Sequence, residues 1–200
     1  MIPALWLVVA YLVGGIPFGY IIVRFTTGRD VRDLGSGNIG ATNVLRTTGR
    51  TVAVITLLLD IAKGFVAVWL MAQATYGSPF WMSMAALAVM AGHAYPVFLK
   101  FEGGKAVASF IGAFLYLTPI PLLAIVVLFV IVVAATRHIS LGSIIAAGTF
   151  PLAVWLILHP PASVVIASII AGAFIVIRHK ANIERIRAGN EYVFSFGKRK

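Results

Sequence analysis

The chain has 200 residues, of which 60% are hydrophobic and only 11% are charged, and its mean hydropathy is +1.00. A typical soluble domain has about 45–50% apolar and about 25% charged residues, so the composition excludes an ordinary soluble domain. It also excludes a disordered chain, which needs low hydrophobicity and high charge. The formal net charge is +10 and there is no cysteine, which excludes disulfides, thiolate nucleophiles and cysteine metal sites.

Apolar stretches of transmembrane length recur along the whole chain. They predict an all-α, polytopic membrane protein, a bundle of seven transmembrane helices in a single domain over residues 1–200. The expected spans cover residues 2–25, 51–74, 80–99, 105–117, 121–136, 141–158 and 163–177. The fourth is only about 20 Å long at 1.5 Å per residue, against a hydrocarbon core of about 30 Å. A re-entrant hairpin formed by the fourth and fifth segments therefore remains an alternative.

The basic residues alternate along the chain with these spans. Of the 16 Lys and Arg, only Lys63 falls in the interior of a span, Arg24 and Lys105 stand at span ends beside charged links, and the links 75–79, 118–120 and 159–162 hold none. The positive-inside rule then predicts a cytoplasmic C-terminus, cytoplasmic charged links and an N-terminus outside. Contact with anionic lipid headgroups also explains the positive charge of these links. It does not explain their glycine, serine and asparagine content.

The first charged link contains the segment 35–46, which reads GSGNIGATNVLR. Its glycines allow turns that aim successive backbone N–H groups at one anion. The segment adds four neutral donors and an arginine fork suited to phosphate or carboxylate; these are Ser36, Asn38, Thr42, Asn43 and Arg46. We interpret the segment as an anion-binding loop; the alternative is a flexible loop at the membrane surface.

The second charged link places Gly103, Gly104 and Lys105 at the expected start of an apolar helix. Helix N-termini favour anions, so a lysine in the first turn indicates a bound anion. The spacing does not match a nucleotide-binding P-loop. The alternative is an interfacial lysine whose ammonium group reaches back to water.

The third link and the C-terminal tail carry the remaining polar candidates. Ser140 is expected to cap the helix over 141–158, and Ser143, three residues on, is expected to face the same polar cavity. The last helix is expected to continue beyond residue 177 and to stop at Gly189. His179 and Asn182 would then share one helix face.

Asp60 and Lys63 stand one turn apart inside the second span. Ionisable groups at that depth are costly and often functional, but the i,i+3 spacing lets the two neutralise each other. We therefore favour a structural ion pair. The four histidines are scattered along the chain and form no metal motif.

Three groups of residues together resemble the signature motifs of one family. They are residues 35–46, then Gly92 and His93 with 96–99 and 101–105, then 178–183 with Arg185, Gly189 and Glu191. They resemble the PlsY family, the bacterial integral-membrane glycerol-3-phosphate acyltransferases that use acyl phosphate. That family commonly has Lys, Gly and Arg where this chain has Glu102, Ala106 and Lys180.

The resemblance implies transfer of an acyl group from acyl phosphate to the 1-hydroxyl of sn-glycerol 3-phosphate. The products are lysophosphatidic acid and phosphate, in the first step of phospholipid synthesis. It implies a bacterial inner-membrane protein, surrounded by membrane lipid, with its active site facing the cytoplasm. No cofactor, metal or nucleic acid is expected. A soluble enzyme that makes acyl phosphate, PlsX, is the expected partner.

We assign the candidate residues to three tasks. The phosphate of glycerol 3-phosphate is expected to bind Ser36, Arg46 and Lys105. The acyl-phosphate head and the developing oxyanion are assigned to Asn38, Gly40, Thr42, Asn43, Gly103 and Gly104. The glycerol hydroxyls are assigned to His179, Asn182 and Ser143, which with Lys105 form the expected catalytic set.

His179 is either the general base for the attacking hydroxyl or a group that orients it while acyl phosphate takes the proton. We favour orientation, because no carboxylate stands at a spacing that would fix the imidazole tautomer. Two other classes of function remain open: a small transporter of organic phosphate anions, and a scaffold that recruits a lipid enzyme. A transporter usually has an inverted repeat and a site near the membrane midplane, whereas these motifs cluster at one face.

Overall fold

A computed structural model describes residues 2–194 of the chain. Lys198, Arg199 and Lys200, which contribute to the basic tail of the sequence, lie outside the described residues. All regular elements in the described part are α-helices or short 3-10 helices, as the sequence predicts. They fall into two compact units, Met1–Leu117 and Thr118–Lys200.

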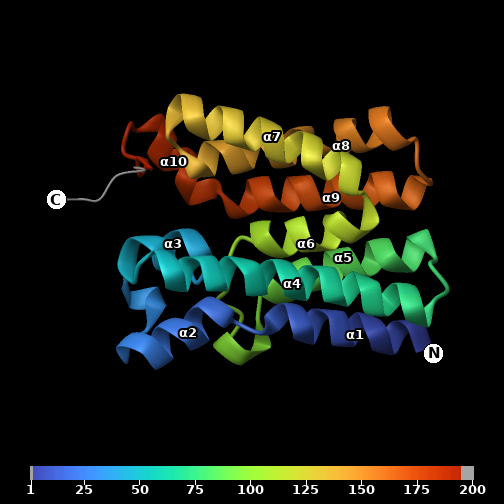
Figure 1. Cartoon of the computed structure of the whole chain (residues 1–200), viewed down its shortest axis with the longest axis horizontal. Helices are drawn as coiled ribbons and strands as arrows, with labels where there is room; N and C mark the ends of the chain where they lie inside the picture. Colours follow the sequence, from blue (N-terminus) through green and yellow to red (C-terminus); the bar gives the residue numbers. More distant parts are fainter. Residues whose placement is uncertain (1, 195–200) are drawn as a thin grey trace. The chain divides into compact units, whose positions relative to one another are not determined.

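The first unit is built around the long helix α4, which packs against α1, α5 and α6 (Figure 1). Helix α1 also packs against α5, and the short helices α2, η1 and α3 contact one another. The elements of this unit are α1 (Ile2–Gly15), α2 (Phe18–Thr27), η1 (Val31–Asp33), α3 (Ala41–Thr47), α4 (Arg50–Ala74), α5 (Pro79–Ala94), η2 (Val97–Leu99) and α6 (Val107–Leu117).

Small residues bring α4 and α6 into close contact. A Cβ atom on Gly64 of α4 would collide with the carbonyl oxygen of Ser109, and one on Gly112 of α6 would collide with that of Ile61. Helices in membranes associate through such small residues, because lipid tails are as apolar as the side chains and supply no hydrophobic driving force. The two glycines therefore set how closely the short helix α6 can approach α4.

The second unit consists of α7 (Pro119–Thr136), α8 (Ile139–Leu158), α9 (Ala162–Arg178) and α10 (Lys180–Arg187). Helix α8 packs against both α7 and α9. The expected continuous last helix is wrong, because α9 and α10 meet at an angle of 55°. The break falls at His179, whose backbone N–H and ring Nδ1 both lie within hydrogen-bonding distance of the carbonyl oxygen of Ile175. Insertion of a side chain among the backbone carbonyls is a common cause of helix kinks.

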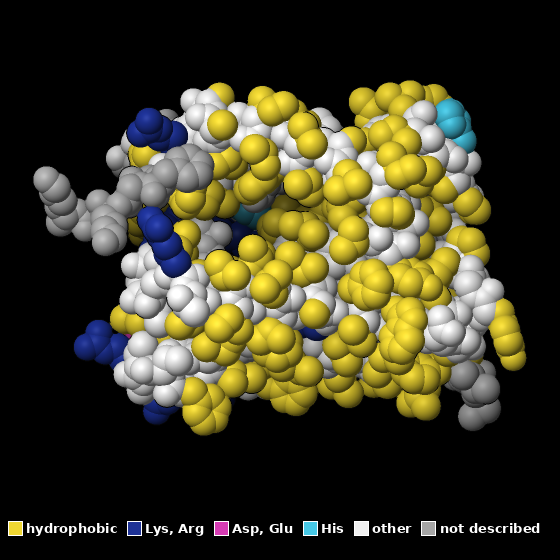
Figure 2. Space-filling model, in the orientation of Figure 1, with side chains coloured by type: hydrophobic (Ala, Val, Ile, Leu, Met, Phe, Trp, Pro, Cys, Tyr) yellow, Lys and Arg dark blue, Asp and Glu magenta, His cyan; other side chains and the backbone are white. Residues whose placement is uncertain are grey.

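Among the described residues, five helical segments are long and apolar enough to cross a membrane: 3–27, Arg50–Ala74, Pro79–Leu99, Pro119–Thr136 and Ile139–Leu158. The bent pair α9 and α10 makes up to six. Hydrophobic side chains cover much of the visible surface of the long helices (Figure 2). Helix α6 has 11 residues and measures about 16 Å, so a seventh crossing stays a prediction.

Candidate functional site

The loop between α2 and α4 is organised around one buried amide, that of Asn43. Its Oδ1 accepts a hydrogen bond from the backbone N–H of Ser36 at 2.8 Å. Its Nδ2 lies 2.9 Å from the carbonyl oxygens of Leu34 and Asn38 and 3.2 Å from that of Val31. The polar atoms of Asn43 are therefore hydrogen-bonded within the loop, and its side chain shapes the loop. This task differs from the direct contact with acyl phosphate that the sequence analysis assigned to Asn43.

Several backbone N–H groups of the segment 35–46 also donate within the loop. Gly40 donates to Oδ1 of Asn38 at 2.8 Å, and Gly37 donates to the carbonyl of Leu34 at 3.0 Å. Gly35 and Gly37 have φ angles of +58° and +71°, which glycine adopts without steric cost. The N–H groups of Gly37 and Gly40 therefore already have acceptors within the loop.

Three side chains of the loop lie at least partly at its surface. Ser36 and Arg46 are exposed and Thr42 is half-buried. Thr42 and Arg46 are four residues apart in α3, which places them on the same helix face. A hydroxyl and a guanidinium on one face form a suitable pair of donors for a phosphate group.

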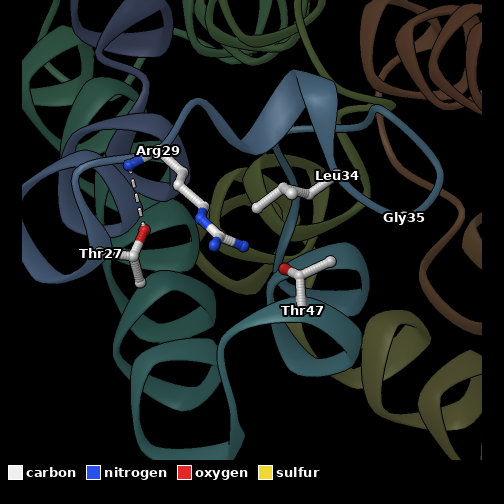
Figure 3. Close-up of a pocket in the computed structure, with 5 residues that line it drawn as sticks. All are labelled: Thr27, Arg29, Leu34, Gly35 and Thr47. Carbon is white, nitrogen blue, oxygen red and sulfur yellow. Dashed lines mark hydrogen bonds between the residues drawn. The ribbon is translucent and has the colours of Figure 1, made fainter.

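Beside this loop lies a hollow of about 420 Å³, lined by Thr27, Arg29, Leu34, Gly35 and Thr47. The side chain of Arg29 extends into it, between Leu34 and Thr47 (Figure 3). The backbone N–H of Arg29 donates to the hydroxyl of Thr27 at 3.3 Å. Sequence analysis did not single out Arg29, because nothing in its position distinguished it from the other basic residues of the link.

Arg32 is held by a neighbouring acid. Its Nη2 lies 2.7 Å from Oδ2 of Asp30. The hydrogen bond with the guanidinium lowers the pKa of Asp30, and the hydrogen bond with the carboxylate raises the pKa of Arg32. Arg32 also lies 3.5 Å from Glu102 of the second link. These ion pairs are solvent-exposed and therefore weak, but they connect the first and second links.

The second link does not begin a helix where the sequence predicted. Helix α6 begins at Val107, so Lys105 precedes its first turn and the argument from a helix N-terminus is wrong. The reason is the backbone at Ala106, whose φ of +61° is incompatible with a continuing helix. Glycine adopts this conformation easily, which agrees with the glycine common in the resembling family.

Gly103 and Gly104 are packed directly against His93 at the end of α5. The N–H of Gly104 donates to the carbonyl of His93 at 3.0 Å. A Cβ atom on Gly104 would collide with Nε2 of the His93 ring, and one on Gly103 would collide with the His93 carbonyl. Only residues without a side chain fit here, so both glycines fix the course of the backbone that leads to Lys105.

The expected pairing of Asp60 and Lys63 is confirmed, with Nζ of Lys63 2.8 Å from Oδ1 of Asp60. Both side chains are 3% exposed. His93 completes the cluster, with its Nδ1 3.6 Å from the same carboxylate oxygen. Sequence analysis gave His93 no role, because it lies 33 residues beyond Asp60 and on another helix.

In the second unit, Ser140 does not cap α8. The helix begins one residue earlier, at Ile139, and the buried Ser140 hydroxyl donates to Oε1 of Glu191 at 3.0 Å. Its expected capping role is therefore wrong, because an N-cap residue precedes the helix, whereas Ser140 already lies inside it. Ser143 is buried too, and its hydroxyl donates to the carbonyl of Ile139 at 2.9 Å, which leaves the oxygen able to accept a hydrogen bond.

His179 occupies the break between α9 and α10. Its Nδ1 lies 2.7 Å from the carbonyl oxygen of Ile175. A carbonyl only accepts, so Nδ1 of the neutral ring carries the proton and Nε2 carries the lone pair. The tautomer is thus fixed by a backbone carbonyl. The sequence analysis considered only a carboxylate for this task.

Glu191 gathers three side chains. Besides Ser140, it accepts from Nδ2 of Asn182 at 2.9 Å and from Nε of Arg185 at 2.8 Å. Burial alone would raise the pKa of Glu191, but hydrogen bonds from Asn182, Arg185 and Ser140 outweigh burial and hold the pKa below its usual value. Glu191 therefore fixes the orientation of Asn182. Sequence analysis quoted it within a motif without giving it a task.

Comparison with known proteins gives consistent matches over nearly the whole chain. A family model for glycerol-3-phosphate acyltransferase matches residues 4–189. A glycerol-3-phosphate acyltransferase of Geobacter sulfurreducens is 46% identical over 186 residues, covering 93% of this chain and 94% of the relative. One from Trichlorobacter lovleyi is 43% identical over 189 residues, covering 94% and 96%.

Two solved structures share the fold, both of PlsY, an integral membrane glycerol 3-phosphate acyltransferase. The glycerol 3-phosphate form is 36% identical, with a TM-score of 0.91 and 96% of each chain covered. The lysophosphatidic acid form is 34% identical, with a TM-score of 0.88, covering 96% of this chain and 95% of the other.

Proposed function

Because the chain belongs to the glycerol-3-phosphate acyltransferase family, we propose that it transfers a fatty acyl group from acyl phosphate to the 1-hydroxyl of sn-glycerol 3-phosphate. The products are lysophosphatidic acid and phosphate. The family match over residues 4–189 carries this conclusion. It also favours an acyltransferase over the transporter and the scaffold, since the relatives are acyltransferases.

Recognition of the glycerol 3-phosphate phosphate is assigned to Ser36, Arg46 and Lys105. Two cations and a hydroxyl suit a phosphate monoester, because charge-assisted hydrogen bonds are about twice as strong as neutral ones. The exposed positions of Ser36 and Arg46 support this assignment.

The acyl-phosphate head is assigned to the two glycine-containing loops. Asn38 and Thr42 offer side-chain donors there, while Gly40, Asn43, Gly103 and Gly104 shape the backbone around them. The internal hydrogen bonds of Asn43 and the tight contact of Gly104 with His93 support a shaping task for these residues. Backbone that is fixed beforehand can stabilise the oxyanion without reorganising during the reaction.

His179, Asn182 and Ser143 are assigned to the glycerol hydroxyls. With Nδ1 bonded to Ile175, the lone pair on Nε2 can accept the proton of a hydroxyl group in a hydrogen bond. A neutral carbonyl fixes the tautomer but lacks the charge with which a carboxylate stabilises an imidazolium. His179 therefore orients the hydroxyl, and an oxygen of acyl phosphate takes its proton as the acyl C–O bond forms and phosphate leaves.

The protein is proposed to lie in the bacterial inner membrane with seven spans, the N-terminus outside, the C-terminus in the cytoplasm and the active site facing the cytoplasm. The charge distribution of the links supports this orientation. Acyl phosphate is a reactive anhydride that has to be made close to where it is used. A soluble acyl-phosphate-producing enzyme (PlsX) is the proposed supplier. Membrane lipid is proposed to surround the acyl chain.

Phosphate release by the purified full-length protein tests the proposal. Acyl phosphate should yield phosphate at a rate that depends on glycerol 3-phosphate, with one lysophosphatidic acid formed per phosphate. Acyl-CoA should not replace the donor. Equal or faster acylation from acyl-CoA, with no phosphate release from acyl phosphate, would overturn the donor assignment while leaving the family intact.

A further inference from the structure

The buried cluster of Asp60, Lys63 and His93 contains one residue, His93, that charge balance does not require. Each of the three residues is at most 4% exposed. Asp60 and Lys63 alone neutralise each other at 2.8 Å, so an ion pair would be complete without a third partner. Polar groups at membrane depth are costly and are usually retained for function. The presence of His93 beside the pair therefore needs its own explanation.

His93 connects this cluster to the loop before Lys105. It stands in the last turn of α5. Its carbonyl accepts the N–H of Gly104 at 3.0 Å, and its ring fills the space that a side chain on Gly104 would need. Backbone and ring of one residue thus hold the same glycine, directly before Lys105 in the chain.

Asp60 in turn lies beside the ring of His93. Its Oδ1 lies 3.6 Å from Nδ1 of His93, a distance of electrostatic contact that is longer than an ordinary hydrogen bond. Asp60 is itself held by Lys63, whose Nζ also donates to the carbonyl of Ile16 at 2.8 Å. Ile16 lies in the break between α1 and α2. The cluster therefore ties α4, α5 and this break to the loop.

We propose that His93, beside Asp60, is a positioning residue that sets the place of Lys105 by fixing the Gly103–Gly104 backbone. This inference rests on the proposed function, in which Lys105 binds the phosphate of glycerol 3-phosphate. His93 itself touches no substrate. Its effect is on substrate affinity through the loop, because a displaced Lys105 would lose part of a charge-assisted contact worth about 10–150-fold in affinity.

A double-mutant cycle on the full-length protein tests this, with glycerol 3-phosphate binding measured by calorimetry without any acyl donor. H93A should weaken binding about 10–100-fold, and K105A should weaken it as well. If His93 acts through Lys105, adding H93A to K105A should produce little further loss. H93N keeps a polar nitrogen near Asp60 and should recover part of the affinity.

Met90 provides the matched control. It lies one turn before His93 on α5 and is 1% exposed, so M90A removes buried volume but none of the polar groups of the cluster. It should lower the melting temperature while leaving the affinity for glycerol 3-phosphate unchanged. Should H93A not fold, the double variant D60N/K63M removes both charges together and should weaken binding in the same Lys105-dependent way.

Additive losses in the cycle, or an H93A variant that behaves like M90A, would overturn the inference. Normal binding by K105A would overturn it as well, since Lys105 would then be no phosphate ligand. These results differ from a failure of the donor assignment, which would leave glycerol 3-phosphate binding intact and abolish only the acyl-phosphate reaction.

Discussion

The first link and the C-terminal tail are each held together by one buried polar side chain, but the two side chains differ in charge. In the first link, the neutral amide of Asn43 satisfies backbone groups of Ser36, Val31, Leu34 and Asn38. In the tail, the carboxylate of Glu191 accepts hydrogen bonds from side chains of α8 and α10. The first arrangement shapes a backbone, and the second orients functional side chains. It follows that the first is independent of pH, whereas the second depends on a charge.

The largest expected effect is that of Glu191→Ala. The substitution leaves Ser140, Asn182 and Arg185 without their shared acceptor. Ser140 and Asn182 are buried donors, and each hydrogen bond to a charged group is worth about 1.5–3 kcal/mol, so the loss should exceed about 3 kcal/mol. Thermal unfolding in detergent should show this loss, together with lost activity. Glu191→Gln serves as the control, because its amide keeps one acceptor oxygen and should retain more stability. An unchanged melting temperature in Glu191→Ala would contradict the organising role.

Asn43→Ala should cost somewhat less, about 2–3 kcal/mol, because the groups it leaves unpaired are neutral. Asn43→Asp sharpens the comparison. It keeps an acceptor for the Ser36 N–H but turns a negative charge toward three carbonyl oxygens, so it should be no better than alanine at neutral pH. Unfolding measurements on the two variants decide this. Wild-type stability in Asn43→Asp would show that Nδ2 contributes nothing.

Substitutions in the first link and in the tail should affect different kinetic constants. Arg46→Ala should raise KM for glycerol 3-phosphate about 10–150-fold, the equivalent of a lost charge-assisted contact of about 1.5–3 kcal/mol. Arg46→Lys should recover only part, because the guanidinium fork is lost. Steady-state kinetics with acyl phosphate measure both variants. Unchanged KM in Arg46→Ala would indicate that the first link only anchors the loop at the lipid surface.

His179→Gln should act mainly on kcat, and by less than the 10²–10⁴-fold expected for loss of a general base. The glutamine amide can still hold a hydroxyl, so a substantial part of the activity should remain and the acidic limb of the pH–rate profile should persist. Near-complete loss of kcat with normal glycerol 3-phosphate binding would instead identify His179 as the base.

The smallest effect is a pH dependence of stability. The pKa of Glu191 is lower in the folded protein than its ordinary value of 4.5, so its contribution is full above that value and is lost as the pH falls through the folded pKa. Melting temperatures measured from pH 6 downward should fall in this acidic range. Glu191→Gln should remove part of the decline, and Asn43→Ala should not. The pKa of Asp30 is also lowered, so Asp30 contributes to the same acidic decline. Asp30→Asn is therefore a necessary control.

The sequence was most informative where a property is local. Hydropathy located every long helix, and the i,i+3 spacing identified the pair of Asp60 and Lys63. The contact of Ser140 with Glu191 joins residues 51 positions apart, and no periodicity encodes such a distance. The late start of α6 depends on one backbone angle at Ala106, which an apolar helix-compatible residue gives no reason to expect. Hence the helices were predictable, but the side-chain network of the site was not.

The short helix α6 has a consequence for the lipid around the protein. Its 11 residues cover about half of a hydrocarbon core of about 30 Å, and Gly64 and Gly112 hold it against α4 backbone to backbone. Tilting would only shorten its reach further, so we expect that α6, as the predicted seventh span, requires the bilayer to thin around it, at a cost that grows with each ångström of mismatch. We therefore expect membrane thickness to affect the loop that carries Gly103, Gly104 and Lys105, directly before this helix.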